Sequence, residues 1–81
     1  MGARRRTYDL ADRAKLGGCI RAVRVKATMS QKQVADVIGQ PQSYIARIES
    51  GERQLLALEF FQICKVLGVA PADVNGSFVD G

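Results

Sequence analysis

The sequence predicts an all-α fold, a compact bundle of five short helices around one core. In successive segments the apolar residues recur every three or four positions, as they do on the buried face of a helix. Glycine and proline, which end and begin helices, separate these segments at Gly39, Pro41, Gly51, Gly68 and Pro71. The 81 residues provide one modest core, close to the size limit at which a domain needs a metal, disulfides or a partner.

The first helix is expected from about Asp9 to Thr28. Its apolar face consists of residues at spacings of four, three and four, namely Leu16, Ile20, Val23 and Ala27. Gly17 and Gly18 each cost about 1 kcal/mol relative to alanine in a helix interior, so the helix could break there. Residues 1–8 include Arg4–Arg6 without apolar periodicity and are predicted to form a flexible basic arm.

The second helix, about Gln31 to Ile38, has a marked start and a marked end. Ser30 and Gln33 form an S-x-x-Q capping box, in which each side chain binds a free backbone amide of the first turn. Gly39 follows where the chain must turn sharply, and a residue with a Cβ there would be strained by about 1 to 2 kcal/mol. The next helix is expected to touch this one at Ala35.

The third helix, about Gln42 to Ser50, is opened by Pro41, whose missing N–H is harmless there. A fourth, about Ala57 to Leu67, can present either of two apolar rows to the core: Leu58, Phe61 and Cys64, or Phe60, Ile63 and Leu67. The stretch Leu55–Leu58 is unusually apolar and could be partner surface. Pro71 starts a short last helix at about Ala72–Val74. The folded domain is therefore expected at 9–75, with the second helix, the turn at Gly39 and the third helix as a helix-turn-helix unit within it, and a flexible tail is expected at 76–81.

The net charge of +4 is concentrated in one part of the chain. Residues 1–54 hold 11 Lys and Arg against five acidic residues, a net charge of +6, whereas residues 55–81 carry −2. A polyanion is the natural partner of such a basic surface, since each neutralised phosphate releases counterions. Because many basic faces are merely solvated, the charge indicates double-stranded DNA as the partner only in combination with the two helices and the turn of Ser30–Gly51 in the same part of the chain.

The composition also excludes several classes of protein. There is no apolar run long enough to span a membrane and no signal peptide, so a cytoplasmic protein is expected. The chain has no histidine, and the spacing of Cys19 and Cys64 matches no metal motif, so neither a metal nor a cofactor is predicted. Cys64 is expected in the core and Cys19 partly exposed. Nothing resembles a paired nucleophile and base, which argues against an enzyme.

From Leu16 to Val74 the chain resembles the phage-repressor and Cro-like helix-turn-helix domains of the XRE family. The motifs that carry the resemblance are Leu16-Gly17 with Ile20-Arg21 and Arg24, then Ser30-Gln31 with Ala35 and Gly39, then IARIESG at Ile45–Gly51, and Leu67-Gly68-Val69. The resemblance implies a lambda-repressor-like five-helix bundle that acts as a dimeric DNA-binding module of transcription regulators.

The third helix carries the residues expected to read bases. Because Ile45 and Ile48 face inward, the opposite side of this helix can enter the major groove. Gln42 and Arg47 are the strongest candidates, since glutamine pairs with adenine and arginine with guanine. The resemblance implies base contacts for both and for Ser43. Tyr44 is equally compatible with a DNA contact and with packing over the helix pair.

A second group of residues is expected to contact the phosphate backbone. Gln31 begins the second helix, whose free amides and positive dipole end favour a phosphate, and the resemblance implies a backbone contact there. Four further candidates, with ordinary solvated surface as the alternative, are Lys32, Gln40, Arg53 and Gln54. The Arg4–Arg6 arm either lies in a minor groove or is solubilising sequence.

Arg24 and Glu49 resemble a family pair that joins the first helix to the end of the third. Their ion pair is interpreted as structural, holding the third helix in place. The sequence predicts no metal-binding residues near this pair.

The leading hypothesis is a sequence-specific transcriptional regulator that binds a palindromic operator as a homodimer, with half-sites about 34–36 Å apart. In the family, dimers commonly use the C-terminal helices, where Val69, Val74, Phe78 and Val79 could supply the apolar patch. The alternative is a protein-interaction module, such as an antitoxin subunit, a restriction-modification controller or a phage accessory protein.

Overall fold

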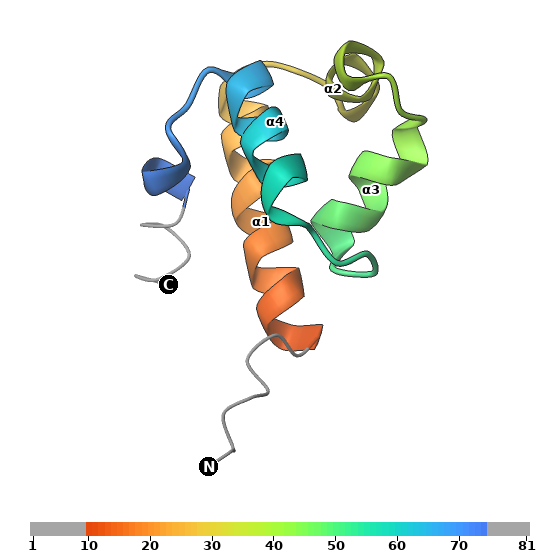
Figure 1. Ribbon diagram of the computed structural model, residues 1–81, viewed down its shortest axis with the longest axis vertical. Coiled ribbons are helices and arrows are strands. Elements are labelled where there is room, and N and C mark those ends of the chain that lie inside the picture. Colours follow the sequence, from red (N-terminus) through yellow and green to blue (C-terminus); the bar gives the residue numbers. More distant parts are fainter. Residues whose placement is uncertain (1–9, 75–81) are drawn as a thin grey trace.

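The computed structural model describes residues 10–74 and contains only helices there. The elements are α1 (Leu10–Lys26), α2 (Gln31–Ile38), α3 (Gln42–Ser50) and α4 (Ala57–Leu67), followed by a helical turn at residues 71–74. In Figure 1, α2 and α3 form the right-hand part of the molecule and the 71–74 turn lies on the opposite side. This architecture confirms the predicted five-helix bundle. The predicted arm at 1–8 and tail at 76–81 lie outside the described residues.

The core takes residues from every element of the described chain. Its buried members are Ile20, Val34, Ala35, Tyr44, Ile45, Ile48, Ile63, Cys64, Leu67 and Val74. In α4 the row with Phe60, Ile63 and Leu67 faces this core together with Cys64, whereas Leu58 is 76% and Phe61 52% exposed. The alternative row is therefore wrong except for Cys64.

Two sequence expectations about apolar surface are settled by the same burial pattern. Val74 is a core residue, so it is not available for the dimer patch proposed with Val69, which is itself partly buried against the core. Cys19 is partly buried and Cys64 fully buried, both as free thiols. In residues 10–74 no helix combines the length and the apolar character needed to cross a membrane.

Helix α1 does not break at its two glycines. Gly17 faces the backbone at the C-terminal end of α3, and a Cβ built on it would lie 2.5 Å from the Glu49 carbonyl oxygen and 2.7 Å from the Glu49 carbonyl carbon. Gly51, just after α3, lies similarly close to the backbone of α1, since a Cβ built on it would lie 2.8 Å from the Ala14 Cα. The glycines thus allow α1 and the end of α3 to pack backbone against backbone.

Helix α1 ends at Lys26, two residues before the predicted end. Thr28 has a left-handed backbone with φ of 59°, so it cannot continue the helix. The Thr28 and Met29 amides donate to the carbonyls of Val25 and Arg24, at 2.9 and 3.2 Å. These bonds satisfy carbonyl groups that the helix end leaves free.

The α2–turn–α3 unit has the predicted start and turn. The Ser30 hydroxyl accepts from the Gln33 amide at 3.0 Å, and the Gln33 side chain accepts from the Ser30 amide at 2.7 Å. Gly39 is left-handed with φ of 75°, and Ala35 has no exposed surface. Pro41 directly precedes α3, whose bounds are those expected, and the Tyr44 amide donates to the Pro41 carbonyl at 3.0 Å.

Candidate nucleic-acid interface

The outward face of α3 presents three polar side chains to solvent. Ile45 and Ile48 are buried, and since residues three apart share one side of a helix, they fix which side of α3 faces the core. Gln42, Ser43 and Arg47 are exposed on the other side, with Ala46 half-buried. The Arg47 Nε lies 3.9 Å from Oε1 of the exposed Glu52, and a surface pair of this kind contributes little. The exposed guanidinium of Arg47 is therefore accessible to an acceptor such as a guanine edge.

Tyr44 does not share this face. Its side chain is a member of the hydrophobic core and is 8% exposed. Burial raises the pKa of its hydroxyl, and the hydrogen bond to Glu59 raises it further. Of the two expectations for Tyr44, the structure favours packing over the helix pair.

A buried ion pair ties α3 to α1. The Arg24 Nε donates to Glu49 Oε2 at 2.6 Å and the Arg24 Nη2 to Glu49 Oε1 at 3.0 Å, while Nη1 binds the Met29 carbonyl at 2.8 Å. Arg24 and Glu49 side chains are 10% and 3% exposed. The hydrogen bond to Glu49 raises the Arg24 pKa, so this arginine stays charged. The arrangement has the bidentate geometry of strong arginine–carboxylate pairs.

This ion pair continues outward to the start of α3. The Gln31 Nε2 donates to Glu49 Oε1 at 3.0 Å, and the Gln42 Nε2 donates to Gln31 Oε1 at 3.2 Å. The chain Arg24–Glu49–Gln31–Gln42 therefore links the interior to a side chain expected to read a base. Each glutamine amide group keeps one N–H, since an amide nitrogen carries two, and within residues 10–74 the Gln42 side-chain oxygen accepts no hydrogen bond.

The residues expected to contact phosphate differ in their surroundings. Gln31 is the first residue of α2, at the end of the helix where backbone amides are unpaired. Lys32 is 71% exposed and pairs with Asp36 one turn later at 3.3 Å, a surface pair that contributes little to stability. Gln40 and Gln54 are exposed. These four side chains are accessible to a ligand.

Arg53, a candidate phosphate contact, is held by other residues of the protein. Its Nη1 and Nη2 donate to the two carboxylate oxygens of Glu59, both at 3.0 Å, and Nη1 also donates to the Gln54 carbonyl at 2.9 Å. Its guanidinium carbon lies 4.7 Å from the centre of the Tyr44 ring, within the range of a cation–π contact.

The sequence interpretation missed Glu59 as a member of this cluster. Glu59 Oε1 also accepts from the Leu56 amide at 3.0 Å, which caps the start of α4. Burial by itself raises the pKa of Glu59, but the bonds from Leu56, Arg53 and Tyr44 outweigh it and lower the pKa overall. The detectable signal was a glutamate in the first turn of a predicted helix, where it can bind a backbone amide.

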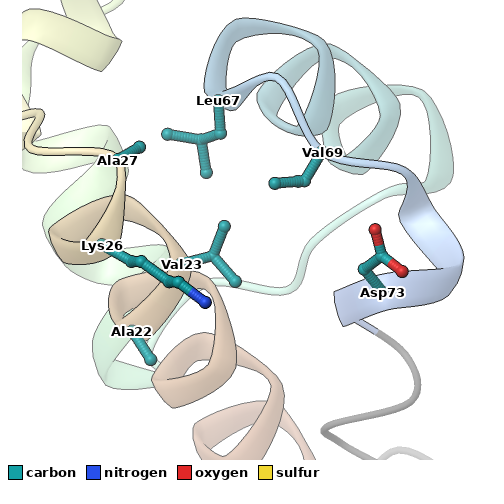
Figure 2. A pocket seen from close by; sticks show the side chains of 7 residues that line it. All are labelled: Ala22, Val23, Lys26, Ala27, Leu67, Val69 and Asp73. Carbon is teal, nitrogen blue, oxygen red and sulfur yellow. The ribbon is translucent and has the colours of Figure 1, made fainter.

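A hollow of about 500 Å³ lies away from α2 and α3. It is lined by Ala22, Val23, Lys26, Ala27, Leu67, Val69 and Asp73. Figure 2 shows Lys26 and Asp73 on opposite sides of an apolar floor. None of the lining residues comes from α2 or α3, so this hollow is separate from the candidate nucleic-acid interface.

Comparisons with known proteins agree with this geometry. A family model described as helix-turn-helix matches residues 20–74, more than half of the chain. The clp gene regulator ClgR from Corynebacterium glutamicum has 22% sequence identity and a TM-score of 0.81, with 85% of this chain and 90% of that chain covered. The restriction-modification controller protein C.AhdI from Aeromonas hydrophila has 26% identity and a TM-score of 0.74, with 79% and 97% covered. A search of curated proteins gave no match.

Proposed function

The chain belongs to the helix-turn-helix family of DNA-binding transcription regulators, and from this premise we propose that it reads a palindromic operator as a homodimer. The observation that carries the proposal is the Gln31–Gln42 hydrogen bond. It joins a side chain at the amide-rich start of α2 to the first residue of α3. A phosphate bound at Gln31 would then position Gln42 against a base edge.

In this proposal Gln42, Ser43 and Arg47 contact bases. Gln42 retains a free carbonyl oxygen and one N–H, the donor and acceptor that adenine requires in the major groove. Arg47 is exposed and only weakly paired, so its guanidinium can bind guanine through two bonds. Each such pair contributes about 1 to 3 kcal/mol of discrimination against the wrong base.

The phosphate contacts are assigned to Gln31, Lys32, Gln40 and Gln54. Phosphate contacts position a protein on DNA without reading its sequence. Alanine at Lys32 should therefore weaken binding to every duplex by a similar factor. For Lys32 the slope of log affinity against log salt should also fall by about 0.9, one phosphate contact.

Selection from a random pool of DNA duplexes tests the base-reading assignment. The wild-type protein is expected to enrich a sequence with two-fold symmetry, because a homodimer presents two copies of α3. Gln42→Ala and Arg47→Ala should lose the preference at one position of each half-site while non-specific binding survives. Gln62→Ala and Arg21→Ala remove the same side chains from exposed positions on α4 and α1 and should select the wild-type sequence. An unchanged preference in both α3 variants would refute the assignment.

A protein-interaction module is the second candidate function. The observation that favours it is the exposed apolar group Leu56, Leu58 and Phe61, all more than half exposed at the start of α4. Light scattering of the wild type and of Leu58→Lys tests whether this apolar group joins two copies of the chain or is left for a different protein partner. Loss of a dimer in the variant would indicate self-association. A monomeric wild type that selects no DNA sequence would favour the interaction module.

A further inference from the structure

The cluster of Tyr44, Arg53 and Glu59 lies beside the outward face of α3. Arg53 belongs to the segment between α3 and α4, and its backbone amide donates to the Arg47 carbonyl at 3.1 Å. Its side chain covers the ring of Tyr44, which is itself an α3 residue. A positive charge at Arg53 would therefore stand next to the residues proposed to contact DNA.

Glu59 occupies the edge of Arg53 that a phosphate would use. A guanidinium presents pairs of N–H groups to carboxylate and phosphate oxygens in the same parallel geometry. In this protein both terminal nitrogens point to the two oxygens of Glu59. Glu59 thus substitutes for a phosphate within the protein, and the pair carries no net charge.

The pair is also protected from screening by water and salt. The Arg53 and Glu59 side chains are 37% and 18% exposed, so the attraction between them is screened less than that of a fully exposed pair. Glu59 receives two further hydrogen bonds, from the Leu56 amide and the Tyr44 hydroxyl. These bonds hold the carboxylate in place and favour its charged form.

We infer that Glu59 sets the DNA affinity of this protein by neutralising Arg53, so that this arginine of the segment between α3 and α4 adds little to binding of non-specific DNA. The inference rests on the proposed DNA-binding function. It replaces the sequence-based expectation that Arg53 is an ordinary phosphate contact. Its consequence is a higher ratio of specific to non-specific binding, because non-specific binding depends almost entirely on charge.

The test measures binding to a short duplex of arbitrary sequence by fluorescence anisotropy over a range of salt concentrations. Glu59→Gln keeps an oxygen for the Leu56 amide and removes the negative charge. One additional phosphate contact steepens the salt slope by about 0.9, which is an affinity gain of about 8-fold at 0.1 M salt relative to 1 M. Glu59→Gln should show this gain, and the double variant with Arg53→Gln should lose it.

Asp73→Asn is the matched control for the change in net charge. Asp73 is an exposed acid at the hollow between α1 and α4, away from α3. Its replacement should raise the affinity by about 2-fold or less, since charges further away than about 10 Å are largely screened at 0.1 M salt. An equal gain in Asp73→Asn and Glu59→Gln would overturn the inference.

A second measurement compares the wild type with the double variant Glu59→Gln/Arg53→Gln. Because the pair carries no net charge, removing both charges together should leave the salt slope nearly unchanged, whereas Arg53→Gln alone would leave Glu59 unpaired and negative beside the DNA. A slope flatter by about 0.9 would overturn the inference and restore Arg53 as an ordinary contact. A wild type that binds DNA but selects no sequence contradicts only the proposed operator function. A wild type that binds no DNA at any salt concentration refutes both proposals.

Discussion

Gly17 and Gly18 are adjacent in α1 but have opposite predicted responses to alanine. At Gly18 a Cβ meets no heavy atom within 4 Å, so Gly18→Ala should gain the helix propensity of about 1 kcal/mol. At Gly17 the Cβ would lie closest to the Ile48 carbonyl oxygen and 2.5 Å from the Glu49 carbonyl oxygen, where at least 3.0 Å is needed. Helix α1 and the end of α3 would therefore have to separate by more than about 0.5 Å. Overpacking of this kind costs about 1 to 3 kcal/mol, and here the obstacle is rigid backbone.

Thermal unfolding followed by far-UV circular dichroism measures both effects. In a domain of this size 1 kcal/mol shifts Tm by about 4 to 8 °C, so Gly18→Ala should raise Tm by about that amount. Gly17→Ala should lower Tm by about 10 °C or more, and because the displaced element is α3, it should also weaken DNA binding. A Gly17→Ala variant as stable as Gly18→Ala would refute the conclusion that α1 and α3 pack backbone against backbone.

Three further predictions follow from single contacts. Glu49→Gln leaves the buried Arg24 guanidinium without its counter-charge and should cost about 3 kcal/mol in urea unfolding, whereas a loss under 1 kcal/mol would contradict the burial of the pair. Thr28→Gly relieves the backbone strain of a left-handed threonine, so the free energy of unfolding should rise by about 1 kcal/mol. A denaturant midpoint below that of the wild type would contradict the left-handed conformation of Thr28. Because the folded pKa of Glu59 is lowered, its contribution to stability is present above the pKa of the unfolded chain and is lost as pH falls below about 4.5. Tm measured against pH should therefore fall less steeply in that range for Glu59→Gln, and parallel curves for the two proteins would contradict this role.

The helices could be predicted from the sequence because their signals are local. Ser30 with Gln33 determines the start of α2 within four residues, and Gly39, Gly51 and Gly68 each end a helix in a left-handed conformation. The periodicity of the apolar residues gave the buried faces of α1, α2 and α3. For α4 two rows were equally apolar. The choice between them depends on which row meets the other helices, which no local signal encodes.

Tyr44 and Arg53 show what the sequence left open in the candidate site. Both were candidate DNA contacts with packing or solvated surface as the alternative, and their surroundings are determined by Glu59, which lies in a different helix. Similarly, Gly17 was counted as a weakness of α1, since helix propensity does not reveal that another backbone approaches it. Such long-range contacts become visible only when the helices are packed.

The network from Arg24 to Gln42 connects the stability of the fold to the reading of DNA. Glu49 Oε1 accepts bonds both from Arg24 and from Gln31, and Gln31 in turn accepts from Gln42. A change in the Glu49 carboxylate therefore alters the orientation of Gln31 and Gln42 even if the protein stays folded. Substitutions at Glu49 and Gln42 should for this reason be non-additive in sequence preference. Additive effects would mean that the buried pair only supports α3 and does not orient its first side chain.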